Sequence, residues 1–290
     1  MPGSIVLLTD STATLPLDVC ETRGIVVVPL QVVIGAKSYD EGPDGTASPQ
    51  TVAEALREWT PVSTSRPTPA AILEAYEKAV AGGATEIVSI HLSSQMSGTF
   101  ESAQLAAADA SVPVTVVDTK QLGMATGFCV LTAADVLDSG GSAADAAAAA
   151  RARAEAITSL FYVDTLEYLR RGGRIGAAAA LLGSALSVKP LLRLEDGRIG
   201  TLEKVRTSGR ALSRLAELAV EAAGDQQVDL AVAHSANPDR ADLLADTLRG
   251  RLETNLGERE IAVGEVGAVI GAHVGPGMVA VVVAPRPAGI

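Results

Sequence analysis

The segment His91–Phe100 places four hydroxyl side chains and a glycine between a predicted strand and a predicted helix. The strand is expected at Glu86–Leu92, which is rich in Ile and Val, and helical spacing begins after the turn. Ser97, Gly98 and Thr99 lie where the first backbone N–H groups of that helix have no partner within the helix. Because the helix dipole adds partial positive charge there, the turn can bind a carboxylate or a phosphate. The alternative is that Ser97 only caps the helix.

Other segments also combine hydroxyl or cationic side chains with turn residues. Thr64 lies in STSRPT, where the proline favours an extended backbone that can point a hydroxyl into a cleft, although helix entry is an equally simple role. Arg174 lies in the glycine turn of RRGGRI, and His273 lies in HVGPG. Asp10 follows the first predicted strand in TDST, where it can face a ligand or make an Asx turn.

Several catalytic and cofactor signatures are missing from the sequence. It has no GxSxG elbow, no Walker A motif and no HRD or DFG motif, which weighs against a hydrolase or an autonomous kinase. Gly275, Gly277 and Ala280 fit GxGxxA, but a strand and not a helix is expected after them, which argues against a dinucleotide site. The three histidines have no metal-ligand spacing. We therefore expect neither a metal nor a cofactor.

The composition limits the classes of function. A net charge of −11 and a pI near 4.8 argue against nucleic-acid binding, and a hydrophobic content of 48% argues against disorder. No uninterrupted apolar run reaches about 18 residues and no signal sequence is evident, so we expect a cytoplasmic protein without a membrane span. Cys20 and Cys129 are distant in sequence and are expected to be buried thiols, the alternative being a disulfide or metal pair.

The elements that position these side chains are expected to form two α/β lobes. Strands at Ile5–Leu8 and Ile25–Ile34 flank a short helix at Pro16–Arg23, which is a βαβ opening. Ser48-Pro49 and Thr68-Pro69 are helix starts with a capping side chain and a proline at the first position. The elements expected after residue 100 in this half are a strand at 114–117 and helices at about 121–137 and 142–157.

A domain boundary is placed near Ile157, which gives a lobe 1–157 with the SGT turn and a lobe 158–290 with the GGRI and HVGPG turns. Asp196-Gly197 between two extended runs predicts a hairpin. The apolar residues 176–182 predict a buried helix, which belongs either to a core or to the wall of a channel. The further strands are expected at 188–194, 198–205, 228–234, 261–266 and 279–284, with helices at 208–223 and 237–251.

Seven of these segments together resemble the DegV family of lipid-binding proteins over nearly the full length. The matching segments, in order, are LLTDSTATLP, STSRPT, HLSSQMSGTFESAQLA, VVDTKQLGMATG, VDTLEYLRRGGRIG, KPLLRLEDGRI with KVRTSGRA, and IGAHVGPGMVAV. The resemblance implies two α/β lobes with a lipid tunnel at and beneath their interface. It also implies that the chain binds a long-chain fatty acid as the lipid-binding subunit of a two-part fatty acid kinase. The separate ATP-binding subunit would phosphorylate the acid to an acyl-phosphate for phospholipid synthesis.

The resemblance also implies roles for individual residues. Thr64 and Ser97 would contact the carboxylate, with backbone donors from Gly98 and Thr99, and His273 and Arg174 would complete the head-group network. Arg206, in KVRTSGR, would contact the kinase subunit. The family usually has Gln where Arg66 stands, which adds a charge here, and often has Leu where Met96 stands, which is a small change in volume.

Two hypotheses for the function follow. The first is a fatty-acid-binding protein that is not an enzyme by itself and presents its ligand to the kinase subunit. The second is a stand-alone acyl hydrolase, or another small-acid enzyme, in which Ser97 is the nucleophile and His273 the base. The sequence favours the first, because no third residue is evident to orient the histidine. Chain length, unsaturation and oligomeric state are not determined by motifs.

Overall fold

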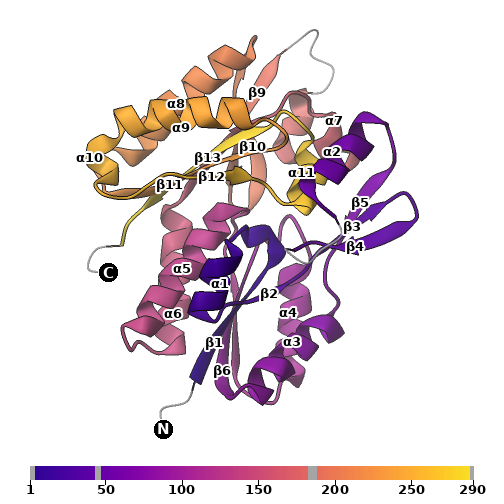
Figure 1. Cartoon of the computed structure of the whole chain (residues 1–290), viewed down its shortest axis with the longest axis vertical. Coiled ribbons are helices and arrows are strands. Elements are labelled where there is room, and N and C mark those ends of the chain that lie inside the picture. Colours follow the sequence, from indigo (N-terminus) through magenta and orange to yellow (C-terminus); the bar gives the residue numbers. More distant parts are fainter. Residues whose placement is uncertain (1–3, 43–46, 182–187, 288–290) are drawn as a thin grey trace.

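A computed structural model describes residues 4–42, 47–181 and 188–287, which form three β-sheets with helices packed against them (Figure 1). The expected α/β class is confirmed. The first sheet is parallel, with the order β2-β1-β6-β7. Its strands are β1 (Ser4–Asp10), β2 (Val26–Val28), β6 (Ala84–His91) and β7 (Val114–Asp118).

Helices cover both faces of this first sheet because its strands are apolar on both sides. Leu8 and Ile87 pack towards α3 (Pro69–Ala81) and α4 (Thr99–Asp109). Leu7 and Val88 point the other way, towards α5 (Met124–Asp138) and α6 (Ala143–Ala156). Figure 1 shows this three-layer arrangement in the lower half, and the short α1 (Leu17–Arg23) joins β1 to β2.

The second sheet is mixed and is built from strands after residue 157, in the order β10-β9-β8-β13-β11-β12. Helices α8 (Ser208–Ala223) and α9 (Pro238–Arg251), with the short α10 (Glu253–Leu256), cover its outer face (Figure 1). The strands are β8 (Thr158–Tyr162), β9 (Lys189–Glu195), β10 (Arg198–Val205), β11 (Val228–His234), β12 (Ala262–Glu265) and β13 (Val279–Pro285).

Strand β13 alternates between two cores, as the period of two along a strand requires. Val279, Val281 and Val283 pack under α8 and α9. Val282 and Ala284 point inward and join a cluster formed mainly by α5 and α6 of the first half. The division at Ile157 stays a prediction, because the two halves share this hydrophobic core.

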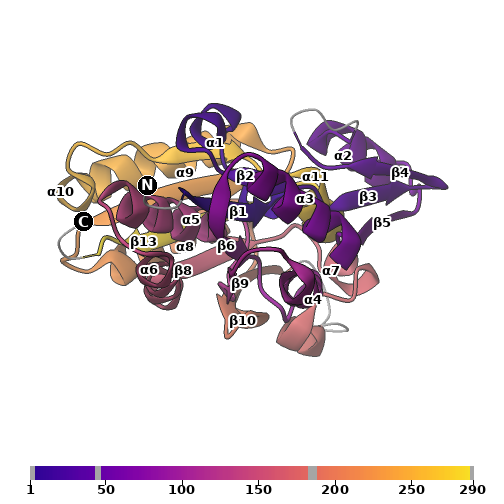
Figure 2. The same ribbon diagram turned by 90° about the horizontal axis from the view of Figure 1, so that it is seen from below.

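A small antiparallel sheet, β4-β3-β5, lies to one side of the molecule (Figure 2). It consists of β3 (Gln31–Ile34), β4 (Lys37–Asp40) and β5 (Val62–Ser65), and α2 (Pro49–Arg57) packs against it. Helix α11 (Ala268–Val274) of the second half packs against both this sheet and α2. This arrangement brings the STSRPT segment next to the HVGPG segment.

The small sheet also corrects one expectation. The run Ile25–Ile34 is not one long strand: β2 ends at Val28 and pairs with β1, whereas β3 pairs with β4 and β5. Pro29 follows β2, and a proline cannot donate a ladder hydrogen bond. The chain therefore leaves one sheet and enters another within three residues.

The predicted helix starts and the predicted hairpin are confirmed. The hydroxyls of Ser48 and Thr68 accept hydrogen bonds from the backbone N–H groups of Thr51 and Ala71. Asp196 and Gly197 both have positive φ, 48° and 77°, as a type I′ hairpin turn requires.

The predicted buried helix after RRGGRI is wrong. Gly176–Leu181 forms a 3₁₀ helix in which only Ala178 is buried, and residues 182–187 lie outside the described chain. Alanine side chains offer little apolar area, so a run of them is not driven into a core as larger side chains are. The described chain also contains a 3₁₀ turn at Ser11–Ala13 and the short helix α7 (Glu167–Arg171).

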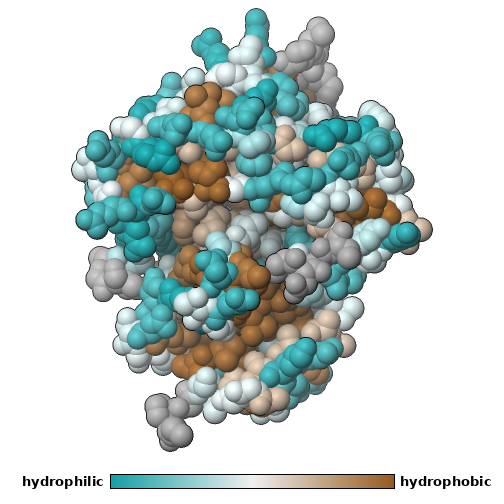
Figure 3. All heavy atoms as spheres, in the orientation of Figure 1, coloured by the Kyte–Doolittle hydropathy of each residue, from teal (hydrophilic) through white to brown (hydrophobic). Residues whose placement is uncertain are grey.

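Hydrophilic residues predominate at the upper end of the face in Figure 3, and its largest hydrophobic patch is in the lower half. Across the three described ranges, none of the helices combines the length and apolar character needed to cross a membrane.

Candidate ligand-binding site

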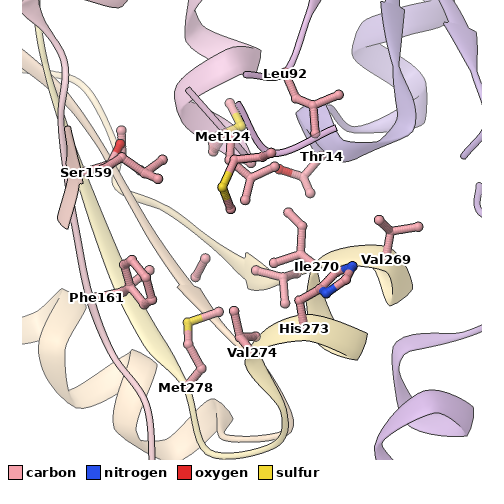
Figure 4. A pocket seen from close by; sticks show the side chains of 18 of the residues that line it. Thr14, Leu92, Met124, Ser159, Phe161, Val269, Ile270, His273, Val274 and Met278 are labelled. Atoms are coloured by element: carbon pink, nitrogen blue, oxygen red, sulfur yellow. The ribbon is translucent and has the colours of Figure 1, made fainter. Parts of the chain in front are cut away.

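A cavity of about 540 Å³ lies between the second sheet and the 92–98 turn of the first half. Most of its wall is apolar, and side chains from both halves of the chain point into it (Figure 4). In that view Phe161 and Met278 lie on one side, Met124 and Leu92 on the other, and the α11 residues Ile270 and His273 close a third. Most polar side chains of the wall belong to residues 64–66, Ser97, Arg174 and His273, and the others are those of Thr14, Ser159 and Glu265.

The 92–98 turn is held from the second half of the chain. The Ser93 hydroxyl donates to the backbone carbonyl of Gly197 at the hairpin tip, over 2.7 Å. Arg198 Nε donates to Gln95 Oε1 over 2.9 Å, and Arg174 Nε donates to the Met96 carbonyl over 3.0 Å. The Asp-Gly hairpin thus fixes the turn from outside the cavity.

Ser97 is not the helix cap that was the alternative role for it. Gly98 is the N-cap of α4, and the Ser97 hydroxyl lies 2.9 Å from the Thr99 hydroxyl. No acceptor among the described residues pairs with the backbone N–H groups of Gly98 and Thr99. These donors remain free to hold an anion at the N-terminus of an eleven-residue helix.

Strand β5 and helix α11 bring Thr64 to His273. The register of β5 on β3 places Thr64 opposite Val32, and the Thr64 hydroxyl lies 2.8 Å from His273 Nε2. The start of α11 is fixed by Glu41, whose carboxylate accepts from the Val269 N–H over 2.7 Å and from the Ser11 hydroxyl over 2.6 Å. Burial raises the pKa of Glu41 above its ordinary value.

His273 is neutral at physiological pH. Burial first, and the positive charge of Arg174 second, lower its pKa to about 4. Its Nδ1 is buried and has no hydrogen-bond partner among the described residues. Because an unpaired buried N–H is rarer than an unpaired acceptor, we assign the proton to Nε2, which donates to Thr64. The Thr64 hydroxyl then has its own proton free for a ligand.

Glycines allow the side chains of His273 and Arg66 to pack closely against the backbone of the site. A Cβ on Gly172 would collide with His273 Nδ1, and a Cβ on Gly98 would collide with the Arg66 guanidinium. Arg66 donates to the Gly98 carbonyl over 3.1 Å and lines the cavity. Arg174 donates to the Met96 and Gly172 carbonyls, and its other N–H groups have no acceptor among the described residues.

The structure brings most of the predicted site residues together. Thr64, Ser97, Gly98, Arg174 and His273 line the same cavity. Thr99 is fully buried and does not line it, although its hydroxyl contacts Ser97. Arg206 is exposed, away from the cavity, and has no ion pair among the described residues.

Sequence reasoning missed the apolar wall contributed by α11 and by the methionines. Val269, Ile270 and Val274 of α11 line the cavity, but a seven-residue apolar helix resembles any core segment in sequence. Met96 and Met124 could have been found from the sequence, because they lie in the segments HLSSQMSGTF and VVDTKQLGMATG, which resemble DegV segments.

A second polar chain lies among the strands of the first sheet and helix α3. His91 Nδ1 is 3.0 Å from Asp10 Oδ2, and His91 Nε2 is 2.7 Å from the Ser89 hydroxyl, which accepts from the Tyr76 hydroxyl over 2.9 Å. All four side chains are fully buried. Asp10 Oδ1 also accepts from the Thr12 N–H, so the Asx-turn interpretation of TDST is confirmed.

The other candidate sites are the two cysteines and a metal site. Cys20 and Cys129 are free, buried thiols, as expected. In the ranges that the structure describes, no group of three or more His, Cys, Asp or Glu residues is arranged to hold a metal ion.

On the surface, the Arg171 guanidinium stacks 4.7 Å from the ring centroid of Trp59, which is 72% exposed.

The arrangement matches a known family. The model of the family described as "Uncharacterised protein, DegV family" matches residues 4–286. The chain belongs to the DegV family. Among its DegV relatives, a DegV domain-containing protein of Streptomyces coelicolor is 52% identical over 286 residues, which cover 99% of this chain and 100% of the relative.

Solved DegV structures share the fold over the whole chain. The structure of a DegV family protein from Thermus thermophilus, described for its fatty acid binding, has a TM-score of 0.90 and 33% identity and covers 97% of this chain and 99% of its own. DegV from Bacillus subtilis, described as a fatty acid binding protein, has a TM-score of 0.87 and 31% identity, with coverage of 98% and 100%. The resemblance seen in the sequence is therefore confirmed.

Proposed function

We propose that this DegV protein binds a long-chain fatty acid in the cavity between its sheets. The observation behind the proposal is a long apolar wall with hydrogen-bond donors at one part of it, from Thr64, Ser97, the start of α4 and Arg174. The fatty-acid-binding relatives from Thermus and Bacillus support the choice of ligand.

Physical magnitudes agree with this ligand class. A 16-carbon chain has about 14 methylene groups, and burial of each stabilises the complex by about 0.8 kcal/mol, so chain burial contributes roughly 11 kcal/mol before ordering costs. Each hydrogen bond to a charged carboxylate contributes about 1.5–3 kcal/mol. The apolar wall therefore supplies most of the affinity, and the donors fix which end of the ligand lies at the 97–98 turn.

Native mass spectrometry of the purified protein tests this function directly. We expect a co-purified mass of a long-chain acid, and rebinding of such an acid after delipidation. A delipidated, folded protein with no measurable affinity for any acid of about 14 to 20 carbons would contradict the proposal.

The hydrolase alternative lacks its central hydrogen bond. His273 Nε2 faces Thr64, and the Ser97 hydroxyl contacts Thr99. His273 Nδ1 has no orienting carboxylate among the described residues, whereas a nucleophile–base pair needs one. Turnover of an acyl ester that is lost in Ser97→Ala would restore this alternative.

We further propose that the chain is not an enzyme by itself and presents the bound carboxylate to the ATP-binding subunit of a fatty acid kinase. Phosphoryl transfer depends mainly on positioning and charge stabilisation, so one subunit can hold the acid while another supplies ATP. Residues 189–210 include six basic and three acidic side chains, in a chain with a net charge of −11. This local excess of positive charge includes Arg206 and suits an acidic partner surface.

Arg206→Ala separates the two roles. We expect unchanged fatty acid affinity and a loss of about tenfold in acyl-phosphate formation with an ATP-binding subunit, whereas Arg251→Ala on α9 changes neither. Equal loss of binding and of phosphorylation in Arg206→Ala would contradict a partner role for this residue.

A further inference from the structure

Three methionines form part of the cavity wall, and they come from three separate elements. Met96 lies in the 92–98 turn, Met124 is the first residue of α5, and Met278 precedes β13. The chain has four methionines, and Met1 is the other. Every internal methionine thus lines the cavity.

The backbones of these residues are fixed while their side chains face the cavity. The Met96 N–H donates to the Ser93 carbonyl over 3.0 Å, and its carbonyl accepts from Arg174. The Met278 carbonyl accepts from the Ser235 N–H over 3.1 Å, and Met124 belongs to helix α5. In Figure 4 the side chains of Met124 and Met278 reach into the cavity from opposite sides. Each methionine is therefore a flexible side chain on a rigid support.

The facing part of the wall is stiff. Val269, Ile270 and Val274 of α11 are β-branched, and β-branched side chains in a helix have essentially one χ1 rotamer. Methionine, by contrast, has three rotatable bonds and a polarisable sulfur, and it is frequent on surfaces that bind several partners by repacking.

We propose that Met96, Met124 and Met278 make the acyl cavity adaptable, so that straight saturated chains and chains bent by a cis double bond bind with similar affinity. The inference rests on the proposed binding of a fatty acid and names the ligand class: long-chain acids of either shape. A bent chain lies against α11 and displaces the methionine side chains, which take other rotamers at little cost.

Two acids of the same length test the proposal. Hexadecanoate and cis-9-hexadecenoate are bound to the delipidated protein, and we expect dissociation constants within about threefold of each other. In the triple variant Met96→Leu, Met124→Leu, Met278→Leu the side-chain volume is nearly conserved but flexibility is lost. The two constants should then differ by about tenfold or more.

The control is Leu215→Met, which makes the reverse exchange in the core under α8 and should keep the wild-type ratio. A wild-type ratio above tenfold, or a triple variant that binds both acids with the wild-type ratio, would overturn the methionine proposal alone. Binding of neither acid to the wild type would overturn the proposed function together with it.

A second measurement uses the unmodified protein and does not depend on the folding of a variant. Peroxide converts exposed methionine to its sulfoxide, and peptide mass spectrometry follows each site separately. Met96 and Met124 are partly exposed, whereas Met278 is only 2% exposed. Saturating hexadecanoate and saturating cis-9-hexadecenoate should therefore each slow oxidation of Met96 and Met124 by at least about threefold. Unchanged oxidation rates with a bound acid would show that the methionines do not contact the chain and would overturn the proposal.

Discussion

His91 and His273 lie in the same molecule in opposite circumstances. Both ring nitrogens of His91 have partners, Asp10 and Ser89, and the ring is fully buried at the end of β6. His273 has one partner, Thr64, and an unpaired Nδ1 at the wall of the cavity. The Asp10–His91–Ser89 chain has the residue types of a catalytic triad, but it is fully buried and all of its groups are paired. The histidine that lies at the cavity is the one with an unpaired nitrogen.

The largest effect is expected from removing the acceptor of the sealed network. Asp10→Ala leaves the His91 ring, the Leu92 N–H and the Thr12 hydroxyl without their acceptor. We expect the free energy of unfolding to fall by about 3 kcal/mol, the cost of several unpaired buried groups, as measured by urea denaturation. The exposed Asp225→Ala should change it by less than about 0.5 kcal/mol. A loss below about 1 kcal/mol in Asp10→Ala would mean that the network is not structural.

At the cavity we expect a large loss of fatty acid affinity and a smaller loss of stability. Thr64→Val removes the hydroxyl that contacts His273 and that we propose donates to the ligand. Fatty acid affinity should then fall about tenfold to a hundredfold in calorimetry, in line with about 1.5–3 kcal/mol for a hydrogen bond to a charged group. The free energy of unfolding should fall less than in Asp10→Ala, by about 1 kcal/mol, because a single buried N–H, that of His273 Nε2, loses its acceptor. Thr201→Val in β10 provides the same exchange away from the cavity. Equal affinities in both variants would remove Thr64 from the site.

A smaller effect concerns pH. The unfolded His273 binds a proton near its ordinary pKa of 6.5, whereas the folded ring does so only near 4. Between these values the unfolded state binds more protons, so His273 makes the free energy of unfolding fall as the pH is lowered from about 6.5 to about 4. His273→Gln should therefore show a shallower decline than the wild type in this window, measured by denaturation at a series of pH values. Parallel curves for the two proteins would contradict a neutral, buried His273.

The smallest effect is expected at Arg66. Its guanidinium is exposed and already donates to the Gly98 carbonyl. Arg66→Gln should change fatty acid affinity by less than about threefold, since exposed charges contribute little, and Arg57→Gln on α2 is the matched control. A tenfold loss specific to Arg66→Gln would place a second cation in the head-group contacts beside Arg174.

The sequence predicted the local features well, because capping and turn chemistry act over a few residues. Ser48, Thr68 and Asp196-Gly197 each mark an element boundary by a hydrogen bond or a backbone angle that their residue type favours. The shift of Ile25–Ile34 from one sheet to another was missed, because the pairing partners of β3 are set by tertiary contacts and not by its own residues.

At the site, too, the sequence indicated the local features but not the tertiary contacts. The residue types of the SGT turn indicated an anion site, and matching family segments indicated its companions. The sequence did not indicate the geometry of the site. His273 faces Thr64 and not Ser97, and Arg174 donates to the Met96 carbonyl. These contacts depend on how α11 and the hairpin pack against the first half of the chain.

The stacking of Arg171 on Trp59 gives the protein a built-in optical probe. Trp59 is the only tryptophan of the chain, so indole fluorescence comes from one position. Arg171 directly precedes Gly172, whose backbone touches the His273 ring. A ligand that shifts the 172–174 turn changes the cation over the indole, and the emission of the unlabelled protein then reports on occupancy of the cavity.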